Sequence, residues 1–368
     1  MKKKNLCKTL LKTMCIVLGI LILALLAYIV YLYASYYRIE DNQELVVEAP
    51  VDDTTTGAAA VLATDTEYSA VTYNIGFGAY LPDYSFFMDG GTSSWAESPE
   101  TVQYAINGAG ELVKSLDPDF ALIQEIDLDA TRSYHTDEYE MLRNILPEYT
   151  TVFAQNYDSA FLFYPFTQPH GSSRAGLGLF SKCPVSSALR RSFPISTSFS
   201  KFFDLDRCYS VSRIPVDNGK ELVIFNLHMS AYGNSDEIRK GQIEMLCNDM
   251  AKEYEAGNYV LCGGDFNHDL KASEEDAESC ESWAFPFPRS ELPEHFTFCL
   301  DLLTEEEQAA LWNSARNADM EYVPGVTYTV TLDGFIISDN IECLSYENVN
   351  TGYSYSDHDP VKVEFMLK

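Results

Sequence analysis

The chain has 368 residues, with 25 Lys and Arg against 55 Asp and Glu, a formal net charge of −30. Its 46% hydrophobic and 13% aromatic residues suffice for a large core, which excludes an intrinsically disordered protein. Residues 1–39 hold six basic and no acidic side chains, so residues 40–368 carry 19 basic against 55 acidic ones, a net charge of −36. Such a charge repels nucleic-acid phosphates and disfavours a protein that coats them, but it is compatible with a metal site.

The first element is an apolar segment at residues 14–34, which contains no charge. A helix of this length is about 30 Å long, enough to cross the hydrocarbon core of a bilayer. Because lysines precede the segment and acids follow it, residues 1–13 are expected in the cytoplasm and the rest of the chain outside. A cleaved signal peptide is the alternative, but the run is long for one and no small-residue cleavage site precedes Tyr36. We therefore expect an uncleaved transmembrane signal anchor at residues 14–35.

Residues 40–67 are acidic, rich in Thr and Ala and without aromatic side chains. This composition predicts a linker, placed at residues 36–67, in which residues 45–47 could add an edge strand. A single folded domain is expected at residues 68–368. The nine cysteines follow no zinc-site spacing, and the sequence fixes no disulfide pairing.

In this domain, apolar strand-like runs alternate with amphipathic stretches, which is typical of an α/β or α+β fold. Several runs, such as LVIFNL, are apolar without alternation, which indicates strands covered on both faces. Strands are expected at residues 69–75, 120–126, 150–154, 177–181, 209–215, 221–228, 259–262, 327–337 and 361–366. Helices are expected at residues 102–116, 139–146 and 236–256, the last with a capping box of Asn234 and Glu237; residues 271–325 are expected to form an irregular insertion.

Polar side chains occur where the apolar runs end. Each one alone has a structural explanation, such as a turn or a loop start. Together they supply metal ligands and proton-transfer groups that strands could bring to one rim of a sheet. The set consists of Asn74, Gln124, Glu125, Asn226, His228, Asp265, Asn267, Asp333, Asp357 and His358.

In chain order, YNI, QE, NLH, GGDFNHD, LDGF and SDHDPV resemble the endonuclease/exonuclease/phosphatase superfamily over about residues 69–367. This superfamily includes DNases, abasic-site endonucleases, neutral sphingomyelinases and inositol-polyphosphate 5-phosphatases. The resemblance implies a four-layer sandwich, in which two packed mixed β-sheets are flanked by helices. It also implies a metal-dependent hydrolase acting on phosphate ester bonds.

The resemblance assigns metal ligands to three of these positions. Glu125 is the main carboxylate ligand, Asn74 a neutral oxygen ligand and Asp357 an additional acidic ligand. Hard oxygen donors of this kind suit Mg²⁺ or Mn²⁺, and one or two ions are compatible with the sequence.

The same resemblance assigns the catalytic roles. Asp265 orients or deprotonates the attacking water, and Asn267, on the same side of an extended chain, donates to the phosphate. His358, oriented by Asp333, lies against the phosphate as a charged imidazolium. His228 protonates or stabilises the leaving oxygen.

Other features carry weaker predictions. Arg174 and Arg207 are basic residues in loops before strands, and either one is a candidate phosphate clamp, with surface ion pairing as the alternative. Residues 157–171 and 193–206 are rich in aromatic side chains. These pack in the core, or they form a platform beside the site that stacks bases or sits among lipid headgroups.

We therefore expect a membrane-anchored, extracytoplasmic, Mg²⁺-dependent phosphoric-ester hydrolase. Its expected substrate is a lipid headgroup or a small phosphorylated molecule, and no obligate protein partner is evident. An extracellular nuclease is the first alternative, and a catalytically inactive binding module on the same fold is the second.

Overall fold

The structure is a computed structural model that describes residues 2–52, 61–202, 204–231, 236–273 and 283–368. The chain divides into two compact units, Met1–Arg38 and Ile39–Lys368. The first unit consists of helix α1 (Lys2–Ser35), of which Leu6–Ser35 is long and apolar enough to cross a membrane. The helix begins before the predicted span because Lys and Leu, which have high helix propensity, dominate its first residues.

The second unit is built around two seven-stranded sheets that pack face to face. One has the order β1 (Gln43–Glu44), β7 (Ser187–Ser192), β8 (Cys208–Pro215), β9 (Glu221–His228), β10 (Tyr259–Asp265), β14 (Asp333–Ser338) and β11 (Phe296–Phe298). The other has the order β15 (Ile341–Asn348), β16 (Val361–Leu367), β3 (Glu67–Asn74), β4 (Phe120–Ala130), β6 (Ser173–Ser181), β5 (Thr150–Asp158) and β2 (Val47–Glu48). Both sheets are mixed, because β9 runs parallel to β10 and β3 runs parallel to β4 while the other pairs are antiparallel.

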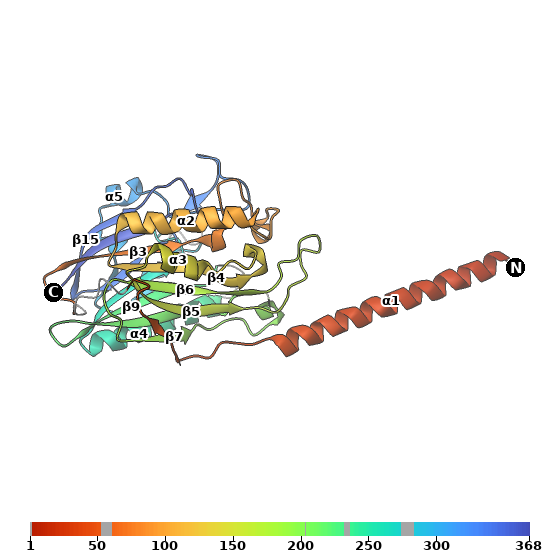
Figure 1. Ribbon diagram of the computed structural model, residues 1–368, viewed down its shortest axis with the longest axis horizontal. Helices are drawn as coiled ribbons and strands as arrows, with labels where there is room; N and C mark the ends of the chain where they lie inside the picture. The colour runs from red at the N-terminus through yellow and green to blue at the C-terminus, as the bar shows by residue number, and fades with distance from the viewer. Residues whose placement is uncertain (1, 53–60, 203, 232–235, 274–282) are drawn as a thin grey trace. The chain divides into compact units, whose positions relative to one another are not determined.

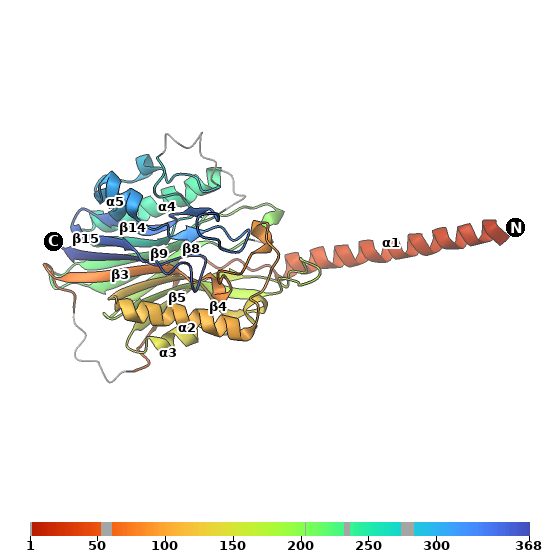
Figure 2. The ribbon, with the colours of Figure 1, turned by 90° about the horizontal axis from the view of Figure 1, so that it is seen from above.

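Helices cover the outer faces of the two sheets (Figure 2). Helices α2 (Pro99–Leu116) and α3 (Glu138–Ile145) lie on the β3–β4 sheet, where Val102, Ile106 and Leu142 share one buried hydrophobic cluster with Ile123. Helix α4 (Asp236–Glu255) covers the β9–β10 sheet, and the short α5 (Glu305–Ala310) lies on the same side (Figure 2). A two-stranded ribbon of β12 (Ala315–Arg316) and β13 (Thr329–Val330) completes the unit.

The inner faces of the sheets meet in one hydrophobic core. Leu122 and Leu179 of one sheet and Leu227 and Leu261 of the other are all buried in it. Strands in such a core are apolar on both faces, since helices cover their other side. The predicted four-layer sandwich is therefore confirmed.

Differences from the predicted elements have local causes. The run 327–337 is broken after β13, where Thr331 and Leu332 leave the ladder. Strands β7 and β15 were not predicted because polar residues, including Arg190 and Arg191, interrupt their apolar positions. Residues 271–325 contain short elements in addition to loops, namely α5, β11 and β12. Asn234 of the predicted capping box lies outside the described residues.

Part of the predicted linker belongs to the folded unit instead. Strand β1 pairs with β7 at the edge of one sheet, and β2 pairs with β5 at the edge of the other. Ile39 is buried, and its backbone N–H donates to Oδ2 of Asp206 at 3.2 Å. Leu45 packs against the core, because the segment contains apolar residues among its acids. Only three residues, 36–38, therefore separate the end of α1 from the folded unit.

Candidate active site

Strand register brings the predicted catalytic residues together. Asp265 ends β10 and pairs with His228 of the parallel strand β9 on one side and with Asp333 of β14 on the other. In the opposite sheet, Asn74 at the end of β3 pairs with Gln124 of β4, next to Glu125. Asn74 Nδ2 joins the two sheets by donating to Asp265 Oδ2 at 3.1 Å and to Glu125 Oε1 at 3.2 Å.

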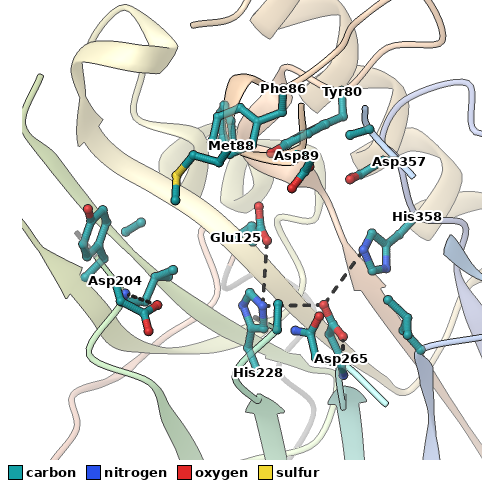
Figure 3. A pocket seen from close by; sticks show the side chains of 18 of the residues that line it. Tyr80, Phe86, Met88, Asp89, Glu125, Asp204, His228, Asp265, Asp357 and His358 are labelled. Carbon is teal, nitrogen blue, oxygen red and sulfur yellow. Dashed lines mark hydrogen bonds and ion pairs between the residues drawn. The ribbon is translucent and has the colours of Figure 1, made fainter. Parts of the chain in front are cut away.

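These residues surround a cavity of about 380 Å³ (Figure 3). Asn74 and Asp333 lie behind the lining and hydrogen-bond to lining residues. Arg174 lies within β6, not in the predicted loop before a strand. It does not line the cavity and forms a 3.1 Å surface ion pair with Asp129. The other residues to which a catalytic, metal-binding or substrate role was assigned line the cavity: Glu125, Arg207, His228, Asp265, Asn267, Asp357 and His358.

Glu125 and Asp357 suit a divalent cation. Figure 3 shows both carboxylates pointing into the cavity. Burial and the charge of Asp357 raise the pKa of Glu125, and burial raises the pKa of Asp357. A bound cation favours the ionised form of both groups and offsets their repulsion. Glu125 has a left-handed backbone (φ +57°) at an irregularity in the β4–β6 pairing, and the structure keeps this costly conformation beside the cavity.

Asn74 is oriented differently from a metal ligand. Its Oδ1 accepts the backbone N–H of Gly76 at 3.0 Å, which leaves Nδ2 facing the carboxylates. In this orientation the amide holds Glu125 and Asp265 in place. Its assignment as an oxygen ligand remains a prediction that requires the side chain to rotate.

Asp265 is buried, and burial raises its pKa to about 7. Its Oδ1 accepts the backbone N–H of Asn267 at 2.8 Å, so the chain turns sharply here. The expected extended chain is wrong, because Asn267 has a left-handed backbone (φ +52°). Asn267 still lines the cavity, and its Nδ2 donates to the carbonyl of Met229 at 2.9 Å.

His358 is held between two carboxylates. Its Nδ1 lies 2.7 Å from Asp333 Oδ2, and its Nε2 lies 3.9 Å from Asp265 Oδ2. Burial disfavours the imidazolium, but Asp333 and Asp265 outweigh it and raise the pKa of His358 well above its usual value. Ser314 Oγ also donates to Asp333 Oδ2, at 2.8 Å. Ligand atoms of Asp265, Asp333 and His358 lie within 4.8 Å of one another, close enough to hold a metal ion. Because His358 and Ser314 both hydrogen-bond to Asp333, we interpret the cluster as a network that holds a proton on His358 and not as a metal site.

Nε2 of His228 faces two carboxylates, with Asp265 Oδ2 at 3.5 Å and Glu125 Oε1 at 3.8 Å (Figure 3). Burial, together with the charges of Arg207 and His358, lowers the pKa of His228 well below its usual value. The two histidines therefore differ in charge near neutral pH. His228 is neutral, and His358 is an imidazolium.

The family model described as "Endonuclease/Exonuclease/phosphatase family" matches residues 71–300 of this sequence. The chain belongs to this family. Members of the endonuclease/exonuclease/phosphatase family hydrolyse phosphate ester bonds and generally use a divalent metal ion, so this protein is a phosphate-ester hydrolase. No curated protein matches the sequence significantly.

Solved structures of the family share the fold at low sequence identity. An endonuclease/exonuclease/phosphatase from Bacteroides vulgatus is 17% identical, with a TM-score of 0.53 over 83% of this chain and 100% of that one. One from Beutenbergia cavernae is 15% identical, with a TM-score of 0.54 over 82% and 72%. TDP2 of D. rerio, solved with a single-strand DNA product, is 14% identical, with a TM-score of 0.54 over 82% and 99%.

Two arginines of this family member were not predicted as site residues. Arg132 lines the cavity and is held by two hydrogen bonds to Asp127, at 2.8 and 3.1 Å. Arg316 also lines it and donates to the carbonyl of Leu81 at 2.9 Å. Neither lies in a strand-end motif, so the sequence contained no signal for them.

Arg207 is the predicted arginine that does reach the cavity. Its Nη1 donates to the carbonyl of Met229 at 2.8 Å, the group that also accepts from Asn267. It ion-pairs loosely with Asp204, at 3.7 Å. Arg207 lies where it could contact a substrate phosphate, so its role as a phosphate clamp stays a prediction. Arg174 does not lie in such a position.

Proposed function

We propose that the protein is a membrane-anchored, Mg²⁺-dependent phosphodiesterase whose catalytic domain lies outside the cytoplasm. The observation that carries the proposal is the position of Asp265, which is paired in register with His228 and Asp333 and faces His358 in one cavity. The substrate is a lipid headgroup or a small phosphorylated molecule.

Each residue has a distinct part in the reaction. Asp265 accepts the proton of a water molecule whose oxygen attacks phosphorus. The imidazolium of His358, fixed by Asp333, binds a phosphoryl oxygen that gains charge in the transition state. As the bond between phosphorus and the leaving oxygen breaks, the N–H of neutral His228 stabilises that oxygen. Asn267 donates a further hydrogen bond to the phosphate once its amide leaves the Met229 carbonyl.

Glu125 and Asp357, with Asn74 after rotation, are the residues that would hold the metal. A bound divalent cation supplies positive charge to the phosphoryl oxygens. Carboxylate and amide oxygens are hard donors, which favours Mg²⁺, and Mn²⁺ is the alternative.

Two observations favour a small substrate over a long nucleic acid. The cavity of about 380 Å³ is the size of a small-molecule site. The net charge of −36 beyond residue 39 slows the approach of a polyanion. The likeness to TDP2 is a likeness in fold alone.

The anchor assignment is part of the proposal. Residues 1–13 are assigned to the cytoplasm, residues 14–35 to the membrane span and residues 68–368, extended by β1 and β2, to the catalytic domain. Protease added to intact cells should digest the domain and leave a short membrane-bound fragment. Full protection, or recovery of the whole chain in the cytosol, would contradict this topology.

The activity is tested with the full-length protein in phosphatidylcholine vesicles. We expect Mg²⁺-dependent hydrolysis, abolished by EDTA, of at least one of sphingomyelin, phosphoinositides, nucleotides and p-nitrophenyl phosphodiesters. Single-stranded DNA and RNA serve as the nuclease arm. Hydrolysis of nucleic acid alone would replace the proposal with an extracellular nuclease.

A further inference from the structure

A second cavity adjoins the catalytic one. It also measures about 380 Å³ and is lined by Phe87, Met88, Tyr157, Leu162, Tyr164 and His170. Three of its lining residues, Met88, Tyr157 and His170, line the catalytic cavity as well. The two cavities therefore share a wall, and we call the second one the apolar annex.

Besides Tyr157 of β5, two segments far apart in the sequence build the annex. One is the 3₁₀ turn Phe87–Asp89, and the other is the loop between β5 and β6, which projects beyond the sheet (Figure 1). Leu162 and Gly171 close the base of this loop with two backbone hydrogen bonds of 3.0 Å. The ring of Tyr164 then packs 5.8 Å from that of Phe87, which closes one side of the annex.

The annex carries no charge near neutral pH. Five of its six residues are uncharged by type, and burial lowers the pKa of His170 to about 3. Its rim is nevertheless open to solvent, because Met88 is 54% exposed and Tyr164 60% exposed. Phe166, two residues further along the loop, is 85% exposed. Apolar side chains gathered at the mouth of a cavity mark a binding surface.

We propose that the annex binds a hydrocarbon chain esterified to the phosphate that the catalytic cavity holds. This inference rests on the proposed phosphodiesterase function and narrows its substrate to phosphoesters with an apolar group. The shared wall at Met88 and Tyr157 argues for an occupant that is continuous with the phosphate. Phe87 and Leu162 offer no hydrogen-bond partner, so a polar group placed against these two side chains would lose its bonds to water at a cost in free energy.

The test compares methyl, butyl and octyl p-nitrophenyl phosphates, all with the same leaving group. The full-length protein, in phosphatidylcholine vesicles with Mg²⁺, should show kcat/KM rising by up to about fourfold per added methylene until the annex is filled. That fold-change corresponds to about 0.8 kcal/mol for each buried CH₂. Equal kcat/KM values along the series would overturn the annex while leaving the hydrolase proposal intact. Hydrolysis of none of the esters at any metal concentration would overturn both.

Two exposed tyrosines, one in the annex and one outside it, test whether the dependence on chain length arises in the annex. Tyr164 is 60% exposed and packs on Phe87, whereas Tyr104, on α2, is 58% exposed and packs on Tyr355. Tyr164→Ser should lower the octyl-to-methyl ratio of kcat/KM about tenfold, and Tyr104→Ser should leave it at the wild-type value. Circular dichroism and the unfolding midpoint show whether each variant is folded. A folded Tyr164→Ser variant with the wild-type ratio would contradict the proposal.

A further arm distinguishes two sources of the same chemistry. A hexadecyl p-nitrophenyl phosphate embedded in the vesicles represents a membrane lipid, and the free octyl ester represents a soluble amphiphile. Chain-length dependence with hydrolysis of the embedded ester supports the annex and a lipid source. If the rate depends on chain length but the embedded ester is not hydrolysed, the result supports the annex and a free, soluble substrate. If Tyr164→Ser impairs only the embedded ester and the soluble series is flat, the loop docks on the membrane surface and the annex proposal is wrong.

Discussion

Nδ1 of His358 lies 2.7 Å from Oδ2 of Asp333, and both side chains are buried. Nδ1–H donates to the carboxylate, so Nε2 faces the cavity and Asp265. The carboxylate also stabilises the imidazolium and, against the effect of burial, raises the pKa of His358. Asp333 therefore sets the orientation and the charge of the group proposed to bind the phosphate.

Asp333→Asn should lower kcat/KM by roughly 10²-fold or more, because the imidazolium loses its fixed orientation and its counter-charge. The pKa of His358 falls in this variant, so activity that needs the protonated ring should be lost at a lower pH than in the wild type. The pH profile of kcat/KM measures this shift of the alkaline limb. His295 and Asp339 form the same 2.7 Å pair at the surface, so Asp339→Asn is the control. An unshifted alkaline limb in Asp333→Asn would rule out this role.

Asp265→Asn keeps the shape of the side chain and removes the proposed base. We expect a loss of roughly 10²–10⁴-fold in kcat that saturating Mg²⁺ does not restore. Since burial raises the pKa of Asp265 to about 7, the wild-type rate should rise with pH up to about 7 as the carboxylate ionises. The variant should lose this acid limb. Wild-type turnover by Asp265→Asn would exclude Asp265 as the base.

Glu125→Gln should fail in a different way, because it weakens a proposed metal ligand. Its activity should be low at limiting Mg²⁺ and should recover in part when Mg²⁺ or Mn²⁺ is raised. A metal titration of the initial rate, run beside Asp265→Asn, separates the two defects. An identical metal dependence in Glu125→Gln and the wild type would remove Glu125 from the ligand set.

The strand-end argument predicted most of the candidate site because each polar residue can be located from the apolar run beside it. His228 and Asp265 end apolar runs, and Asp333 interrupts one and begins β14. Parallel and antiparallel pairing of these strands aligns the three residues. The left-handed turn at Asn267 was not predictable, since the residues around it fit an extended chain equally well.

Long-range contacts account for the rest. Arg174 and Arg207 look alike in sequence, each a single arginine before an expected strand. In the structure Arg174 lies within β6, and only Arg207 reaches the cavity. Arg132 and the apolar annex depend on the packing of distant loops, for which a single sequence contains no periodic signal. The edge strand expected at residues 45–47 is present only in part, as β2 (Val47–Glu48). Strand β1 was not predicted, because a two-residue strand is too short to show a pattern.

His228→Gln should depend on the leaving group. The neutral imidazole is proposed to stabilise the leaving oxygen, which matters most for a basic alkoxide. We expect roughly a 10²-fold loss with an alkyl leaving group and a much smaller loss with p-nitrophenolate, which leaves without help. The slope of log kcat/KM against leaving-group pKa measures the difference. His135→Gln, at an exposed histidine, is the control. If His228→Gln lost the same factor in kcat/KM with every leaving group, His228 would not act on the leaving oxygen.

His170 should make the fold sensitive to acid. Burial lowers its pKa to about 3 in the folded protein, below the usual 6.5 that applies when the chain is unfolded. Its contribution to stability is therefore complete above pH 6.5 and is lost as the pH falls towards 3, because the unfolded chain binds the proton first. Between pH 7 and pH 5 this amounts to about 2 kcal/mol. His170→Gln should remove this part of the decline, while His295→Gln, at an exposed ring, should keep it. Denaturant unfolding followed by tryptophan fluorescence at pH 7 and pH 5 provides the comparison, and an equal decline in His170→Gln and the wild type would show that the ring titrates normally.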